Sequence, residues 1–478
     1  MINDIFNILL PQFVLGGFII LLLILSMVFS PRLYRYARII AATGISLSVV
    51  FLSTVQTEPQ YFGFRNSVMS DSYTLLFDFI ILGCGFLVTL LSKNLAKSSK
   101  RNAYTFFAIL LTAIFGAMNV VSANDFLTLL VSVELLGFST YFLISVSKGY
   151  HSKEAAFKYL ITSAVSTGIF LFGVSYLYGI TGSLNFTKIY EYITQNNTSL
   201  VYTVSAIMII LGLASKLSIF PFANWVIDVY KGTETSVLAY LSTIPKLAMF
   251  GIICRLLVFP LSNSVEIVFV ISLLSILTAL WANTYAIREK NVKVILACSS
   301  SANASYALLT AASPVSVYNL SAVVFYLICY VIMNIGVFAY LNMYGDEKSF
   351  DVNAFSGIFH KNHGFTALYA ILIIGLAGIP VTSGFVAKIY LFTAIASSGL
   401  IYVPFLIALL FLMVIALFYY LKILLPLFDT YDKNKDAEKL RMNFSQQFVI
   451  VSAVIITLLL GVCPEMLIEL CKFIAYNI

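Results

Sequence analysis

Apolar residues run through this 478-residue chain in long segments that are separated by short polar stretches. A helix of about 20 apolar residues is long enough to cross the hydrocarbon core of a bilayer. The segments lack the alternation of transmembrane β-strands, which excludes a barrel. The pattern therefore predicts an all-α membrane protein. Its fourteen expected spans are residues 5–29, 38–56, 72–92, 103–122, 125–146, 155–179, 200–230, 234–259, 264–286, 292–312, 316–344, 364–397, 401–428 and 444–470.

Composition agrees with a location in a membrane. The chain is 60% hydrophobic and 10% charged, whereas about a quarter of the residues in a soluble domain are charged. The first segment lacks a basic region before it and a small-residue cleavage site after it, so it is predicted to be a span and not a signal peptide.

Loops that are rich in basic residues alternate along the chain with loops that contain few. The loops that follow odd-numbered spans hold 19 of the 28 Lys and Arg residues, and the remaining loops and the C-terminal tail hold only Arg65, Lys188 and Lys472. Loops rich in Lys and Arg stay on the cytoplasmic side. The odd-numbered loops are therefore predicted to face the cytoplasm or matrix, and both termini the outer side. The net charge of +7 indicates topology and not nucleic-acid binding.

Several kinds of site have no ligands in this sequence. The six cysteines are scattered without a CxxC pair, so the usual iron–sulfur and zinc sites are excluded. His151, His360 and His363 all fall in predicted loops, so paired haem ligands within the spans are missing. A glycine-rich phosphate loop is also missing. The chain is predicted to perform no covalent chemistry of its own.

Six basic residues and one clear acidic counterpart fall within the spans. Charged groups at membrane depth are costly and mark ion or proton pathways. Arg255 and Lys422 lie near predicted helix ends, where long side chains reach the interface. Lys158, one turn into its span, fits either that explanation or a functional one. The candidate residues for proton transfer are Glu134, Lys158, Lys216, Lys246 and Lys388, of which Glu134 and Lys246 are expected at span centres.

Two of the spans contain helix breakers beside a lysine. Broken helices at membrane depth are tolerated only inside protein or along a hydrated cavity, and they mark paired sites in internally repeated transporters. Desolvation favours the neutral amine of a lysine and a nearby carboxylate favours the ammonium, so a switchable balance would create a proton-loading site. The breakers are Pro221 after Lys216, and Gly378, Pro380 and Gly384 before Lys388.

The two broken spans, the seventh and the twelfth, are five positions apart in the order of spans, and because this number is odd they run in opposite directions. Helices 4–8 and 9–13 are therefore predicted to form two inverted five-helix repeats. The expected domains are the first three helices (1–102), the two repeats (103–259 and 264–428), and an inner loop with the last helix (429–478).

Several motifs surround these charges. They are "VELLGFSTYFLI", "EAAFKYLITSA", "GSLNF", "KLSIFPFANWVIDVYKG", "STIPKLAMF", "NVKVILACSSSANASY" and "GIPVTSGFVAKIYLF". With these motifs in the same order, the sequence resembles the antiporter-like subunit N (mitochondrial subunit 2) of respiratory complex I, NADH:ubiquinone oxidoreductase, from about residue 120 to 420. "DVYKG" favours this subunit over its paralogues and over sodium/proton antiporters.

Two positions depart from the family pattern. Ala223 and Asn303 stand where the family usually has histidine, so a histidine-dependent relay is not carried over to this chain. Any relay here is expected to use the lysines, Glu134, hydroxyl groups and water.

The resemblance implies a membrane-arm subunit that pumps protons while redox chemistry proceeds in other subunits. Glu134 would tune Lys216, and Lys158 would support the Glu134 side. Lys246 would carry the proton laterally, and Lys388 would exchange it with an outer half-channel. The chain itself is expected to bind no cofactor and no metal. NADH, FMN, iron–sulfur clusters and ubiquinone are expected in partner subunits, and antiporter-like paralogues and lipids are expected as neighbours.

Other interpretations stay open at this point. The chain could belong to a multisubunit cation/proton antiporter or a membrane hydrogenase, or it could be a membrane scaffold that no longer pumps. A free-standing solute permease is a further alternative. The bias toward Phe, Tyr, Ile and Asn favours an AT-rich genome, as in mitochondria or some bacteria. Because the missing histidines indicate a divergent lineage, the mitochondrial inner membrane is expected, with a bacterial plasma membrane as the alternative.

Overall fold

The computed structural model describes most of the chain, with the backbone alone for residues 2–8. Several loop residues counted for the topology lie outside the described part: Arg32, Lys97, Lys100, Arg101, Lys148, Lys348, Lys433, Lys435, Lys439 and Arg441. The described residues are 2–28, 34–55, 61–93, 95, 102–146, 149–196, 199–261, 265–313, 316–345, 349–429 and 443–477.

The structure is an all-α multi-pass membrane protein, as predicted. Within the described residues, 13 helical segments are long and apolar enough to cross a membrane. Two shorter apolar helices, α17 (His363–Ala377) and α18 (Ser383–Ser397), together fill the remaining predicted span. The expected spans and the observed segments therefore correspond one to one.

Most of the chain divides into two compact units. Unit 1 contains residues Met1–Leu217, Thr243–Val270 and Ile474–Ile478, and unit 2 contains Ser218–Ser242 and Ile271–Phe473. The first three spans pack in the same unit as the helices that follow them. The inverted repeats and the domain limits expected from the sequence stay a prediction.

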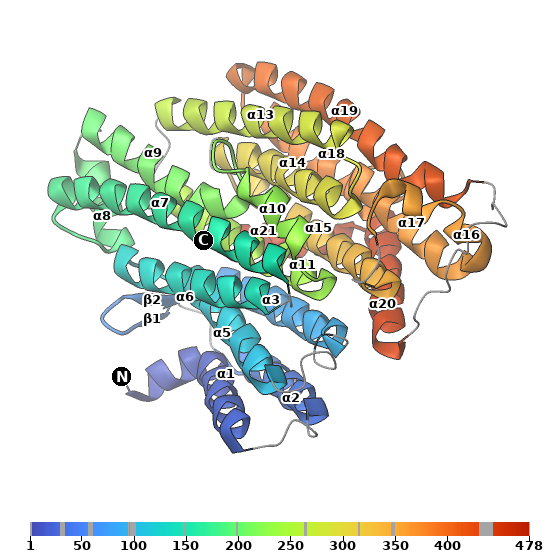
Figure 1. Ribbon diagram of the computed structural model, residues 1–478. Helices are drawn as coiled ribbons and strands as arrows, with labels where there is room; N and C mark the ends of the chain where they lie inside the picture. Colours follow the sequence, from blue (N-terminus) through green and yellow to red (C-terminus); the bar gives the residue numbers. More distant parts are fainter. Residues whose placement is uncertain are drawn as a thin grey trace. The chain divides into compact units, whose positions relative to one another are not determined.

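Unit 1 is a helical bundle with a small β-hairpin. Figure 1 shows α1, α2 and α5 side by side, and these three helices contact one another pairwise. The hairpin pairs Tyr61 with Ser70 and Gly63 with Val68 in antiparallel register. Its elements are α1 (Ile2–Val28), α2 (Tyr34–Leu52), β1 (Tyr61–Gly63), β2 (Val68–Ser70), α3 (Ser72–Leu91), α5 (Ala103–Ser122), α6 (Phe126–Ser145), α7 (Tyr150–Thr181), α8 (Phe186–Gln195), α9 (Leu200–Ala214), η3 (Ser215–Leu217) and α12 (Ile244–Val258).

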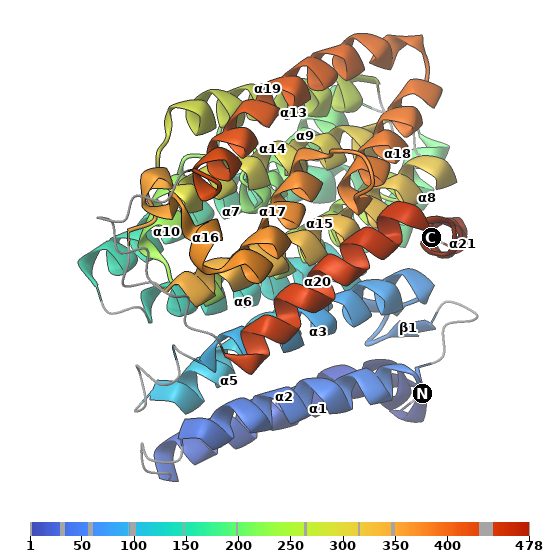
Figure 2. The same cartoon turned by 90° about the vertical axis from the view of Figure 1, so that its right-hand side faces the viewer.

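Unit 2 is built around α15, which contacts α11, α14, α17, α18 and α20. In Figure 2, α20 (red) lies across α15, α17 and α18, and it contacts all three. Its helices are α10 (Trp225–Gly232), α11 (Thr235–Leu241), α14 (Val292–Ala312), α15 (Val317–Tyr344), η4 (Val352–Phe355), α16 (Ile358–Lys361), α17, α18, η5 (Leu400–Tyr402), α19 (Val403–Leu427) and α20 (Phe444–Val462). Two helices have residues in both units, α13 (Val265–Arg288) and α21 (Glu465–Tyr476).

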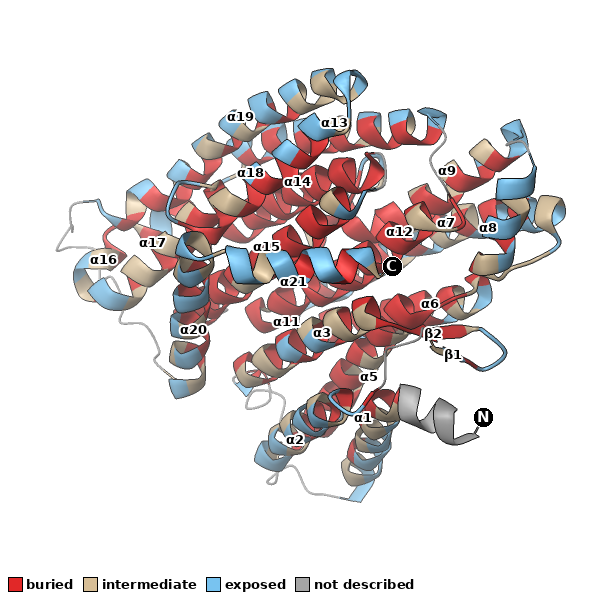
Figure 3. Cartoon of the chain, turned by 180° about the vertical axis from the view of Figure 1, so that it is seen from behind, coloured by how far each residue is buried: buried red, intermediate tan, exposed pale blue. Residues whose placement is uncertain are grey.

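Burial separates the interior of unit 2 from its surface. Every residue of α14 is buried, and α14 is almost entirely red in Figure 3. By contrast, α19 exposes apolar side chains at alternating intervals of four and three residues, which places them on one helical face. An apolar face of this kind is suited to lipid or to a neighbouring membrane subunit. The exposed residues of this face are Ile407, Phe411, Val414, Phe418, Leu421 and Leu425.

Candidate functional site

Lys216 lies where the seventh predicted span breaks. The α-helix α9 ends at Ala214, and Lys216 is in the single 3₁₀ turn η3 that follows. Ser218 then adopts a left-handed conformation (φ 59°), and the Phe220–Pro221 peptide bond is cis. The helix resumes at Trp225 as α10. The interruption expected from Pro221 is therefore observed.

Hydroxyl groups and aromatic rings surround the Lys216 ammonium. Its Nζ donates to the Tyr141 hydroxyl (3.3 Å) and to Ser163 Oγ. The same nitrogen lies 5.7 Å from the ring centre of Tyr141 and 5.8 Å from that of Tyr159, within the range of cation–π attraction. Because Lys216 is buried, these contacts replace the water that its charge would otherwise need.

A threonine links Glu134 to the cavity beside Lys216. Thr167 on α7 donates to Glu134 Oε1 at 2.6 Å. Thr167 and Lys216 both line a cavity of about 10 Å³, which is room for about one water molecule. Glu134 is half-buried. Among the described residues Glu134 and Lys216 form no direct ion pair, and Thr167, which binds Glu134 and lines the cavity with Lys216, connects their surroundings.

Lys388 lies at the second break. The helix α17 ends with Gly378 in the left-handed conformation (φ 83°). The chain turns through Val381, which also has a positive φ of 78°, and restarts at Ser383. A side chain at Gly384 would collide with the carbonyl oxygen of Gly375. The predicted breakers Gly378, Pro380 and Gly384 therefore lie in or beside the observed turn.

The Lys388 ammonium binds the open end of α17. Its Nζ donates to the carbonyl oxygens of Leu376 (2.8 Å) and Ala377 (3.0 Å). The last carbonyls of a helix lack partners within the helix and carry partial negative charge. The buried ammonium supplies hydrogen-bond donors to these carbonyls, and their partial negative charge compensates its positive charge.

A second small cavity connects Lys388 with Asn303. Lys388, Asn303, Tyr326 and Tyr330 line this space, which measures about 10 Å³. The Tyr326 hydroxyl donates to Asn303 Oδ1 (2.9 Å), and Asn303 Nδ2 donates to the Tyr420 hydroxyl (3.2 Å). The amide of Asn303, where the sequence resemblance led us to expect histidine, is therefore hydrogen-bonded to tyrosines. Unlike an imidazole, an amide does not exchange a proton near neutral pH.

Lys246 lies at the middle of the eighth span (Thr235–Val258), as expected, but it stands in the first turn of α12 because the helix of this span is interrupted. The eighth span is interrupted between Leu241 and Ile244. Pro245 stands at the start of α12, where proline is well tolerated. Lys246 is buried, and α12 packs against η3, the turn that contains Lys216.

Lys158 differs from the other four candidates because its side chain is exposed. Its Nζ forms an ion pair with Glu154 Oε1 at 2.9 Å, one turn earlier on α7.

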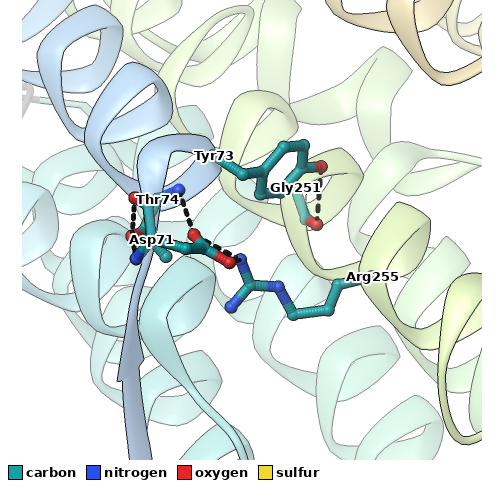
Figure 4. Close-up of polar contacts among 5 residues, drawn as sticks. All are labelled: Asp71, Tyr73, Thr74, Gly251 and Arg255. Atoms are coloured by element: carbon teal, nitrogen blue, oxygen red, sulfur yellow. Dashed lines mark hydrogen bonds and ion pairs between the residues drawn. The ribbon is translucent and has the colours of Figure 1, made fainter. Parts of the chain in front are cut away.

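The sequence interpretation of Arg255 was wrong. Arg255 was expected to reach the interface, but it is fully buried. Its Nη2 donates to both carboxylate oxygens of Asp71, at 2.9 and 2.8 Å, as Figure 4 shows. Lys422 does lie at a helix end, where it binds the carbonyl of Ile287 at 2.9 Å. Asp71 was not among the predicted site residues. The sequence feature that could have identified it is its position as a helix cap before an apolar segment.

Sequence comparison assigns the family. Residues 123–416 match the sequence model described as NADH:quinone oxidoreductase/Mrp antiporter, TM. The match covers more than half of the chain. The chain belongs to this family.

Relatives within the family align with nearly the whole chain. NADH-quinone oxidoreductase subunit N of Bacillus anthracis is 32% identical, over 96% of this chain and 93% of the relative. A chain of respiratory complex I from Thermus thermophilus has a TM-score of 0.82 at 25% identity, covering 97% of this chain and 99% of that one. A chain of the Mrp complex from Dietzia sp. has a TM-score of 0.82 at 19% identity, covering 100% and 98%, and it shows the fold alone.

The family members found are mostly bacterial. Others named subunit N also come from bacteria, and those named subunit 2 come from cyanobacteria and a chloroplast. These relatives therefore do not support the expected location in the mitochondrial inner membrane. They do support a multi-pass protein of a respiratory membrane.

Proposed function

We propose that this chain is a proton-translocating membrane-arm subunit of respiratory complex I, in which electron transfer from NADH to quinone drives proton pumping. The observation that carries the proposal is the Lys216 site. A buried lysine lies at a helix break, beside hydroxyl partners and a cavity that it shares with Thr167, the hydrogen-bond partner of Glu134. Family membership and the names of the relatives support the same assignment.

In the proposed mechanism Lys216 loads and releases a proton. Its partners Tyr141 and Ser163 are hydroxyls, which can donate or accept. They can therefore hydrogen-bond to the lysine in either protonation state. Glu134 favours the charged state by its field, and Thr167 orients the carboxylate. A change in the charge or position of Glu134 would shift the balance and move the proton.

Lys246 and Lys388 are the proposed later carriers. The packing of α12 against η3 supports transfer from Lys216 toward Lys246. Lys388 would exchange the proton with the outer side through its cavity and the surrounding tyrosines. The exposed Lys158 has a supporting role at most in this scheme.

The chain supplies no redox step in this proposal. NADH, FMN, iron–sulfur clusters and ubiquinone would be bound by partner subunits. The exposed apolar face of α19 supports contact with neighbouring membrane subunits or lipid. The bacterial relatives support a bacterial plasma membrane as the location.

The family also includes Mrp antiporter subunits, so a cation/proton antiporter is the second candidate. Affinity purification of the tagged chain in mild detergent separates the two. We expect subunits of a quinone reductase to co-purify and little stable monomer to form. Co-purified antiporter subunits would support the second candidate. A monodisperse monomer that exchanges solutes alone would contradict both.

A further inference from the structure

The first turn of α3 contains a fully paired carboxylate. Asp71 caps the helix by accepting from the Thr74 backbone N–H at 2.8 Å. The same carboxylate binds Arg255 on α12, as Figure 4 shows. Asp71 and Arg255 are both buried, with 2% and 0% of their side chains exposed. Their opposite charges cancel inside unit 1.

A second carboxyl, Asp78, lies two helical turns further along α3. Seven residues place Asp78 on nearly the same face as Asp71, about 10 Å along the axis. Asp78 is only 2% exposed. Two further charged groups belong to the same pair of packed helices, Asp71 at the start of α3 and Arg255 on α12. Among the described residues Asp78 has no ion pair, and its hydrogen-bond partner is Gln12 on α1, whose Nε2 lies 3.3 Å from Asp78 Oδ2.

This contact leaves two acceptors without a donor. Neither Asp78 Oδ1 nor Gln12 Oε1 has a hydrogen-bond donor among the described residues, and Gln12 is itself only 5% exposed. Buried acceptors without a donor are costly. An ionised Asp78 would also leave one uncompensated negative charge, because Asp71 already neutralises Arg255. One proton on Asp78 would remove the charge and supply a donor.

We propose that Asp78 is a proton-binding site. In the folded chain Asp78 holds a proton and forms a neutral acid–amide pair with Gln12, accepting from Nε2 and donating through its own O–H group. Asp71 alone serves as the counter-ion of Arg255. The site belongs to unit 1 and is separate from Glu134 and the lysines.

Whether Asp78 keeps this proton depends on whether Asp71 neutralises the nearby Arg255. Arg255 Nε and Nη1 have no acceptor among the described residues, so the guanidinium has donors to spare. If Asp71 loses its charge, Arg255 needs another carboxylate. Asp78 is the carboxyl group further along the same helix that can provide it. Asp78 would then release its proton to the solvent and become the counter-ion.

Infrared difference spectroscopy tests the proposal on the full chain in lipid nanodiscs at neutral pH, with aspartate labelled with ¹³C at the side-chain carboxyl. We expect the wild type to show the C=O band of a protonated aspartic acid and Asp78→Asn to lack it. Asp71→Asn should lose the same band although Asp78 is present. A wild-type spectrum without that band would overturn the proton site, and a band that persists in Asp71→Asn would overturn its link to Arg255.

Folded yield provides a second measurement. Asp78→Asn replaces a neutral acid by a neutral amide of the same shape, so its yield should equal that of the wild type. The double variant Asp71→Asn/Asp78→Asn leaves Arg255 without a carboxylate, and its yield should fall by about tenfold or more. If Asp78→Asn alone reduced the yield as much as the double variant, Asp78 would be required as a charge and the proposal would fail.

Discussion

The two broken helices present their lysines to different kinds of acceptor. In unit 1, Lys216 donates to side-chain hydroxyls of Tyr141 and Ser163. In unit 2, Lys388 donates to two main-chain carbonyls at the end of α17. Hydroxyl groups can reverse their hydrogen bonds, whereas carbonyl oxygens only accept. The same motif, a lysine beside a break, is therefore built in two chemically different ways.

The difference indicates different tasks in proton transfer. The Lys216 partners can follow a change in protonation, and in the proposed mechanism Glu134 adds a field that can drive it. The carbonyls hold Lys388 in one position and use two of its three ammonium donors. The remaining donor is available to the cavity that Lys388 shares with Asn303 and Tyr326. We therefore interpret Lys216 as the tuned group and Lys388 as the group that exchanges protons.

The largest expected effect is the loss of Lys216. In the assembled complex, Lys216→Met should reduce quinone-dependent proton pumping to roughly a tenth of wild type or less, since a positioned proton-transfer group contributes about a hundredfold or more. Lys216→Arg should fail as well, because a guanidinium does not release its proton. Pumping is measured in proteoliposomes and normalised to intact complex, with the exposed Lys188→Met as the control. Wild-type pumping by Lys216→Arg would remove Lys216 from the mechanism.

Lys388→Arg tests the other half of the comparison. Arginine keeps the charge and the donors that bind the α17 carbonyls, but it cannot release a proton. If Lys388 exchanges protons, pumping should fall clearly while assembly is retained. The same proteoliposome measurement applies. Full activity in this variant would reduce Lys388 to a helix cap.

A smaller effect is expected at Thr167, which holds Glu134 in place. Thr167→Val removes the donor to Glu134 Oε1, and leaving a partly buried acceptor without a donor costs about 1–3 kcal/mol. We expect a partial loss of pumping with normal assembly. Thr162→Val on the same helix is the matched control, because the Thr162 hydroxyl bonds only the Lys158 carbonyl. Equal effects of the two substitutions would contradict the role of Thr167.

The smallest effect is expected at Lys158. Its ion pair with Glu154 is solvent-exposed and spans one helical turn, and such pairs contribute about 0.3–0.5 kcal/mol. Lys158→Met should therefore change pumping by less than about twofold. A loss comparable to that of Lys216→Met would show that a neighbouring subunit covers Lys158 and uses its charge.

The spans could be predicted from the sequence because membrane helices require local runs of apolar residues. The breaks at Pro221 and Gly378–Gly384 were visible for the same local reason. The break before α12 was missed although Pro245 marks it, because proline at the start of a helix is compatible with a continuous span in sequence.

The site could be predicted only in part. The lysines stand out because charge is rare in the spans, but their partners do not. A hydroxyl in a membrane helix commonly bonds a carbonyl of its own helix, as Thr162 does. Nothing in the sequence distinguishes Thr162 from Thr167. The pairing of Arg255 with Asp71 joins residues 184 positions apart, and local patterns contain no information on such a contact.

Asp71 both caps α3 and neutralises Arg255, and this double role should restrict which residues occur at position 71 in the family. As a helix cap alone, position 71 would accept asparagine, serine or threonine about as well as aspartate. As the counter-ion of Arg255 it requires a carboxylate. Lineages that keep arginine at position 255 are therefore expected to inherit an acidic residue at 71, and neutral capping residues are expected to appear there only in lineages that have lost the arginine or that keep an acidic residue at position 78 to replace it.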